Sequence, residues 1–272
     1  MTKKETIFVT VKTYPNTSSK YSELVCTAGL REDGSWIRIY PVPFRLLSDD
    51  KQFHKYTYIR VPIRKNTSDS RPESYKIANS EEIEILAHID TTNGWERRKD
   101  HVFKSKIYTN MAEIIHKANG ERALSLATFK PSKILGFYAE KNKSEALTKQ
   151  EALKFTNANK SLFNFVSLKN MPKIAYSFKI EFEDDTGKVS KMTILDWEFL
   201  QLYVNYRYSK KISQKESKEK VLQQLRHFHD KKNLYFFLGT TSRFDGWATN
   251  PFTIIGIFYP PKDGRLHTQS LF

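Results

Sequence analysis

Aromatic and basic side chains alternate in one short stretch of this sequence. Residues 36–40 read Trp-Ile-Arg-Ile-Tyr, and in a strand this alternation places Trp36, Arg38 and Tyr40 on one face. Aromatic rings can stack on unpaired bases while a guanidinium group binds phosphate. The face is therefore a candidate surface for nucleic acid. The alternative is that Trp36 and Tyr40 belong to the core and Arg38 is a structural arginine.

Other stretches combine basic side chains with aromatic, hydroxyl or amide groups. They are the polar loop 64–71, the run 203–208 (Tyr-Val-Asn-Tyr-Arg-Tyr) and the glycine-bearing loop 238–251 between two apolar segments. Polar loops held between buried strands are common binding sites, although a plain solvent loop is the alternative. The further candidate contacts to bases and phosphates are Arg45, Arg64, Arg71, Tyr206, Arg207, Arg243, Trp247 and Asn250.

Asp196 and Glu198 are the candidate catalytic carboxylates. They stand where a predicted strand gives way to a helix, and a carboxylate there could activate water or stabilise a cationic sugar, as base excision requires. Trp197, Tyr203 and Asn250 could then line a pocket for a base. The simpler interpretation is that Asp196 caps the helix and Glu198 compensates its dipole.

The short motifs of large enzyme families are absent from the sequence. It has no phosphate-binding G-x-x-x-x-G-K-[ST], no G-x-G-x-x-G, no H-E-x-x-H and no G-x-S-x-G. His227 and His229 are two residues apart and would point to different faces of a helix, and the single Cys26 excludes a cysteine-rich zinc site. We expect no metal and no cofactor, and any enzyme activity to be that of a DNA glycosylase rather than a nuclease.

The composition favours a folded protein with a polyanionic partner. Forty-five lysines and arginines stand against 30 acidic residues in 272, a formal net charge of +15, and 14% of residues are aromatic. Nucleic acid is the commonest polyanion, although lysines that merely solvate the surface are the alternative. The sequence has no apolar run long enough to span a membrane and no signal peptide, so we expect a cytoplasmic protein that does not bind membranes.

The hydrophobic patterns predict a β-rich α+β fold. Strands are expected at 7–12, 23–28, 35–40, 55–63, 83–89, 133–139, 174–182, 189–195, 234–238 and 252–259, and helices over 94–121, 144–154, 196–208 and 215–230. Five short strands in the first ninety residues fit a small barrel. We expect two small OB-like barrel or mixed-sheet lobes with inserted helices: an N-terminal β lobe (1–92), a helical or mixed connection (93–170) and a C-terminal α+β lobe (171–272).

The run Cys26-Thr-Ala-Gly, followed after a turn by Trp36-Ile-Arg, resembles the start of the dual OB domain. That domain occurs in uncharacterised prokaryotic proteins of conflict and mobile-element neighbourhoods. Runs at 40–45, 71–74, 196–198, 235–241 and 250–256 are similar to a wider group of such proteins. The resemblance implies tandem small barrels, contact with nucleic acid and a defence setting, but no particular reaction. The helical stretches after Gly94 depart from a plain pair of barrels.

Three hypotheses follow for the function. The leading one is a protein of antiviral defence or DNA modification that binds nucleic acid, more plausibly DNA, in single-stranded or modified form. The second is an N-glycosylase that excises bases from modified phage DNA. The third is a scaffold that binds protein partners through exposed aromatic side chains.

Overall fold

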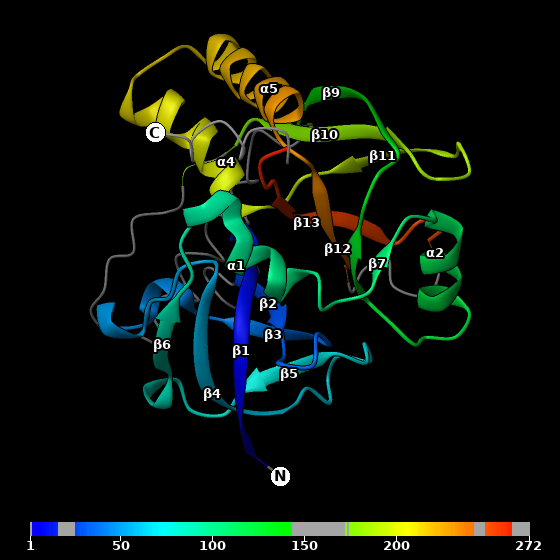
Figure 1. Ribbon diagram of the computed structural model, residues 1–272. Coiled ribbons are helices and arrows are strands. Elements are labelled where there is room, and N and C mark those ends of the chain that lie inside the picture. Colours follow the sequence, from blue (N-terminus) through cyan, green and yellow to red (C-terminus); the bar gives the residue numbers. More distant parts are fainter. Residues whose placement is uncertain (1, 16–24, 143–171, 173, 242–247, 263–272) are drawn as a thin grey trace, which may run out of the picture.

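Five strands near the N-terminus close into a barrel in the computed structural model, which describes residues 2–15, 25–142, 172, 174–241 and 248–262 (Figure 1). The strands are β1 (Lys3–Lys12), β2 (Val25–Leu30), β3 (Trp36–Val42), β4 (Thr57–Lys65) and β5 (Ser74–Ile77). They pair in the order β1-β2-β3-β5-β4, and β4 pairs again with β1. Only β3 and β5 run parallel. This closed ring is compatible with an OB-like fold.

Alternation along the strands separates the interior of the barrel from its outer face. Apolar residues at every second position fill the interior, among them Ile7, Val9, Ile37, Ile39, Ile59, Val61 and Ile63. Trp36, Arg38 and Tyr40 project from the outer face of β3, as the sequence predicted. A sixth strand, β6 (Glu84–His88), pairs with β4, and short 3₁₀ turns lie at Phe44–Leu46, Asp49–Lys51 and Ser80–Glu82.

The second half contains two further sheets. Its strands are β7 (Ile107–Tyr108), β8 (Leu126–Phe129), β9 (Lys133–Lys141), β10 (Tyr176–Glu183), β11 (Val189–Thr193), β12 (Tyr235–Thr240) and β13 (Phe252–Phe258). They form the sheets β11-β10-β9 and β13-β12-β8-β7. The fold is thus strand-rich α+β, as predicted. Strands β5 and β8, of four residues each, have no clear alternation and were not predicted.

The two later sheets repeat the strand order of the barrel. Only three residues separate β8 from β9, so the two act as one bent strand that pairs with β12 at one end and β10 at the other. Just after β11, Ile194 forms a parallel bridge with Ile254 of β13. The resulting order, β9-β10-β11-β13-β12-β8, matches the order β1-β2-β3-β5-β4-β1 of the barrel. In this second ring, β11 and β13 are joined only by the bridge between Ile194 and Ile254.

Helices connect and cover these sheets. They are α1 (Thr92–Val102), α2 (Met111–Asn119), α4 (Trp197–Val204), which continues into the π-helical turn η4 (Asn205–Ser209), and α5 (Gln214–Lys231). The helical stretch predicted at 94–121 is two helices with β7 between them, and the helix predicted at 144–154 lies outside the described residues. No helix of the described chain is long and apolar enough to cross a membrane.

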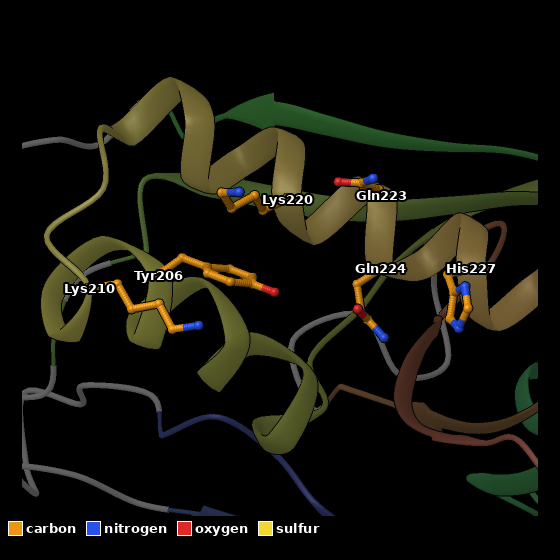
Figure 2. Close-up of a pocket in the computed structure, with 6 residues that line it drawn as sticks. All are labelled: Tyr206, Lys210, Lys220, Gln223, Gln224 and His227. Carbon is orange, nitrogen blue, oxygen red and sulfur yellow. The ribbon is translucent and has the colours of Figure 1, made fainter.

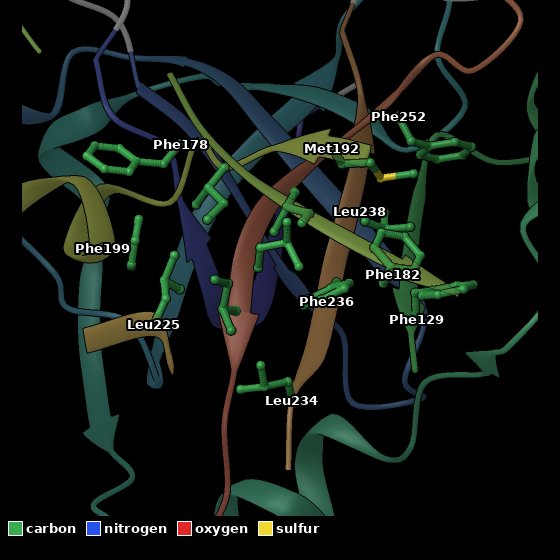
Figure 3. Close-up of a cluster of buried hydrophobic side chains, with 14 of the residues drawn as sticks. Phe129, Phe178, Phe182, Met192, Phe199, Leu225, Leu234, Phe236, Leu238 and Phe252 are labelled. Carbon is green, nitrogen blue, oxygen red and sulfur yellow. The ribbon is translucent and has the colours of Figure 1, made fainter. Parts of the chain in front are cut away.

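Two hydrophobic cores lie outside the barrel. The larger one fills the space between the two later sheets and α2, α4 and α5, and Figure 3 shows Phe129 of β8, Phe182 of β10 and Phe236 of β12 gathered in it. The second core joins the two halves of the chain. It contains Phe8, Val11, Tyr56 and Trp95 from the first half, and Leu126, Phe237, Ile255 and Phe258 from the second.

Lys12, at the end of β1, packs into an aromatic environment between the barrel and α4. Its Nζ donates to the Phe53 carbonyl at 3.0 Å and lies 3.5 Å from the centroid of the Phe44 ring and 4.9 Å from that of Trp197. Burial lowers the pKa of Lys12 to about 8, against the opposing attraction of Glu198. The aromatic faces offset part of the cost of holding the charged form.

The stability of the fold should depend on the protonation of Lys12. Because the pKa of Lys12 in the folded state lies below the ordinary lysine value of 10.5, the folded protein releases this proton first as pH rises, and folding is favoured as pH rises from about 8 to 10.5. Lys12→Met removes this gain. Urea unfolding across that range should show the free energy of unfolding of the wild type, relative to Lys12→Met, rising by about 1–3 kcal/mol. A difference independent of pH would contradict this prediction.

Candidate functional site

Asp196 ties α4 to the barrel and to β13. Its Oδ1 accepts a hydrogen bond from the Phe199 backbone N–H at 3.2 Å, which confirms the predicted N-cap. Its Oδ2 accepts from Lys55 Nζ at 2.8 Å and from the Ile257 N–H at 3.0 Å. Both oxygens are engaged in the fold, and the side chain is only 3% exposed. The geometry therefore favours a structural role over that of a general base.

Glu198 contacts the same lysine from the surface. Its Oε2 lies 3.2 Å from Lys55 Nζ, and its side chain is 55% exposed. Although burial by itself disfavours a charged lysine, Asp196 and Glu198 raise the pKa of Lys55 well above its usual range. The lysine is therefore charged and neutralised, and Glu198 is the carboxylate of the pair that solvent reaches.

The face of Trp36, Arg38 and Tyr40 is not a free surface. Arg38 is 1% exposed, and its Nη2 donates to the Ser125 carbonyl at 3.1 Å. The Trp36 ring packs edge-on against Phe237 of β12 at 5.3 Å, while Tyr40 is half-buried. The alternation that predicted one shared face is correct, but β8 and β12 cover the Trp36 and Arg38 part of it. The bases and phosphates expected there would have to displace the second half of the protein.

The two arginines at the ends of the loop predicted over residues 64–71 differ in their exposure. Arg64 is exposed, whereas Arg71 is buried. Arg71 forms an ion pair with Asp69 at 2.6 Å and donates to the Thr240 carbonyl at 2.6 Å. Burial opposes the charge on Asp69, yet hydrogen bonds from Arg71 and Ser74 lower the pKa of its carboxyl. Arg71 thus joins the barrel to β12.

The remaining candidates do not gather in one place. Arg45 is half-buried in the first 3₁₀ turn. Asn250 is exposed, and its Oδ1 accepts from the Phe252 N–H at 3.0 Å just before β13. Arg243 and Trp247 lie outside the described residues.

Tyr206 lies in a groove between η4 and α5. The groove has a volume of about 500 Å³ and is lined by Tyr206, Lys210, Lys220, Gln223, Gln224 and His227, which together we call the basic groove. Figure 2 shows Tyr206 and Lys210 on one wall, with Gln224 and His227 pointing from α5 toward the same space. Lys210 Nζ lies 5.3 Å from the centroid of the Tyr206 ring.

The local sequence explains how these walls face each other. Lys211 has a positive φ of 55°, and the chain reverses there. Ser213 then caps α5 by accepting from the Glu216 N–H at 3.2 Å. Arg207, predicted beside Tyr206, donates to the Ile212 carbonyl at 3.4 Å and so supports this reversal. The two walls are therefore consecutive parts of one chain segment.

Sequence reasoning missed the α5 wall of the groove. Lys220, Gln223, Gln224 and His227 have the spacing i, i+3, i+4 and i+7, which places them on one helical face opposite the buried Val221 and Leu225. That spacing was the available signal. The spacing alone does not place this face next to Tyr206, because that depends on the chain reversal at Lys211, which no sequence pattern predicted.

Positive charge is concentrated around the basic groove. Residues 205–232 contain nine lysines and arginines against three acidic residues. About a tenth of the chain therefore carries six of its 15 excess positive charges. Among the described residues, no group of three histidine, cysteine or acidic side chains could hold a metal ion. The groove is suited to binding an anionic ligand that has flat apolar parts.

Comparison with known protein families divides the chain in two. Residues 3–104 match a domain of unknown function (DUF8758), and residues 107–272 match a second domain of unknown function (DUF8757). The border falls between α1 and β7. No curated protein matches the chain.

Replacing Asp196 should destabilise the whole protein. Asp196→Ala leaves Lys55 charged, buried and without its main partner, which costs about 3–5 kcal/mol, and the melting temperature should fall by about 6–15 °C. Glu198→Ala is the matched control because it removes the exposed partner of the same lysine and should cost less than about 1 kcal/mol. Thermal unfolding measures both, and equal effects would contradict the structural role of Asp196.

Proposed function

The chain belongs to the family defined by the domain of unknown function DUF8757, and we propose that this member binds nucleic acid through the basic groove between η4 and α5. The single observation that carries the proposal is that the half-buried Tyr206 ring lines one groove with lysines and glutamines, in the segment with the densest positive charge of the chain. Lysines bind phosphates, tyrosine stacks on bases, and amide side chains bind base edges.

Two further features favour a single strand. Tyr208, 46% exposed, adds a second accessible ring two residues after Tyr206, although it does not line the groove. The Arg207 guanidinium lies 5.6 Å from the Tyr208 ring. Rings can stack only on bases that are not paired in a duplex. The resemblance of residues 26–38 to dual OB domain proteins makes DNA, in a defence setting, the first ligand to test.

The outer face of the sheet β11-β10-β9 is the competing surface. It carries Lys179, Lys191 and the exposed Tyr138, but Lys179 lies 2.5 Å from Glu140 and the Tyr138 hydroxyl donates to Glu181 at 2.7 Å. Lys191 lies 3.6 Å from Glu140 as well. Lys220 of the basic groove also has an acidic partner, Glu216 at 3.8 Å, but the net charge of six over residues 205–232 gives the groove the stronger attraction to phosphate.

Reversing two charges in the groove should weaken binding of a single-stranded oligonucleotide. Lys210→Glu with Lys220→Glu removes phosphate contacts and adds repulsion, so the affinity should fall at least about tenfold. The slope of log affinity against log salt should become shallower by about 1–2. Fluorescence anisotropy across a salt series measures both quantities.

A matched charge change separates the groove from the net charge of the protein. Lys133→Glu with Lys188→Glu alters the total charge equally, at exposed positions near the β10–β11 turn. This control should keep most of the affinity and the original salt slope. Equal losses from both pairs would mean that the overall charge, and not the groove, attracts the strand.

Removing the groove's aromatic ring should lower affinity without changing the salt slope. Tyr206→Ala deletes one stacking surface, which is worth about 1–3 kcal/mol per base, so binding should weaken about 5- to 150-fold. Tyr138→Ala removes an exposed ring on the competing sheet face and should have little effect. A loss confined to Tyr138→Ala would move the interface to that sheet.

A further inference from the structure

A second cavity lies where the two matched domains meet. It has a volume of about 360 Å³, and we call it the junction cavity. Residues before β4, at the end of β6 and in α1 supply one side, while α4 and the end of β13 supply the other. Its lining residues are His54, Lys55, Tyr56, His88, Thr91, Trp95, Arg98, Glu198 and Tyr259. No role assigned so far uses it.

Aromatic rings form much of the cavity wall. The Trp95 ring lies 4.9 Å from that of Tyr259 and 6.1 Å from that of Tyr56. The Arg98 guanidinium lies 4.0 Å from the Tyr56 ring and is fixed by donation from its Nε to the Ile89 carbonyl at 2.7 Å. The wall therefore offers flat, rigid surfaces of the kind on which a planar ligand stacks.

The backbone is strained where it presents two of these rings. Tyr56 has a φ of 62°, and Asn93, Gly94 and Trp95 form a left-handed turn with φ of 49°, 64° and 68°. A left-handed conformation costs bulky L-residues about 1–2 kcal/mol each. Such strain persists where the surrounding structure imposes it, and it concentrates at ligand sites. Here it holds Tyr56 and Trp95 against the cavity.

The Tyr56 hydroxyl has no hydrogen-bond partner among the described residues, although the side chain is 4% exposed. A buried hydroxyl without a partner costs free energy. The ring lines the junction cavity, so a ligand with a polar edge is the partner that this position can offer. A purely hydrocarbon ligand would leave the Tyr56 hydroxyl without a hydrogen-bond partner and would not recover this free energy.

The charges around the cavity nearly cancel. Asp196 and Glu198 both pair with Lys55, and Glu198 and Arg98 line the cavity as well. His88 is held by Thr57 Oγ1 at 3.0 Å and by Arg98 at 3.4 Å, and burial together with Arg98 lowers its pKa, which disfavours the charged imidazolium. An isolated phosphate would meet the Glu198 carboxylate as well as the Arg98 guanidinium, so a neutral, polar, aromatic ring is the better match.

We propose that the junction cavity binds a nucleobase that carries an exocyclic amino group. The base packs against Trp95 and Tyr259, which line the cavity, the Tyr56 hydroxyl bonds to a nitrogen or oxygen at its edge, and the exposed carboxylate of Glu198 accepts from the amino group. The base belongs either to a free nucleoside or to a bound strand. Tyr259 stacks on Phe228 at 4.7 Å, and Phe228 follows His227 of the basic groove, so the two sites are adjacent.

Free nucleosides test the cavity without the groove, because they carry no phosphate. Isothermal titration with guanosine, cytidine and adenosine should show binding that does not depend on salt, with uridine weaker. Tyr56→Phe should weaken it by about three- to tenfold while leaving the melting temperature unchanged or higher, since it removes an unpartnered hydroxyl. Glu198→Gln should abolish the preference over uridine. Tyr138→Phe is the matched control and should change neither property.

A strand tests the second source of the base. A single-stranded oligonucleotide with one fluorescent aminopurine should change its emission on binding, and Tyr56→Phe should reduce that change without altering the salt slope. If neither nucleosides nor the aminopurine respond to Tyr56→Phe and Glu198→Gln, the proposal is overturned, even where the groove still binds the strand. Nucleoside binding without oligonucleotide binding would instead overturn the role of the groove alone.

Discussion

The buried ion pair of Lys55 and Asp196 is the contact on which the arrangement of the two halves depends. A charged pair inside a protein is tolerated only when further hydrogen bonds complete it. Here the α4 N-terminus and the Ile257 N–H of β13 supply them on the aspartate. The Asp196 carboxylate thereby fixes the start of α4, holds the end of β13 and, through Lys55, holds the barrel against both. The basic groove and the junction cavity both follow from where α4 begins.

The contact between the halves also decides which surfaces remain for ligands. In the barrel, the outer face of β3 is covered by β8 and β12, and Arg71 reaches across to β12. In the second ring, the corresponding sheet face is exposed, but Lys179 and Lys191 on it both contact Glu140. The helices inserted between β11 and β12 provide the basic groove instead. In the barrel, short 3₁₀ turns occupy the equivalent connection between β3 and β4.

Local sequence patterns predicted most of the helices and strands but few of the tertiary contacts between them. Period-two alternation found β3 and its outward face, and the Asp196 cap located α4, because both depend on residues close in sequence. The burial of Arg38 depends on Ser125, which is 87 positions away. The junction cavity needs residues from both halves of the chain, and its left-handed turn contains Trp95, a residue type that rarely adopts that conformation. Neither feature has a signature in sequence.

The core shared by the two halves makes them thermodynamically inseparable. Phe8, Tyr56 and Trp95 pack with Phe237 and Phe258, so each half buries apolar surface that only the other can cover. Cutting the chain at the border near residue 105 would expose these rings on both fragments, each of which would then tend to aggregate. We therefore expect the halves to unfold in one cooperative transition, because they share this core.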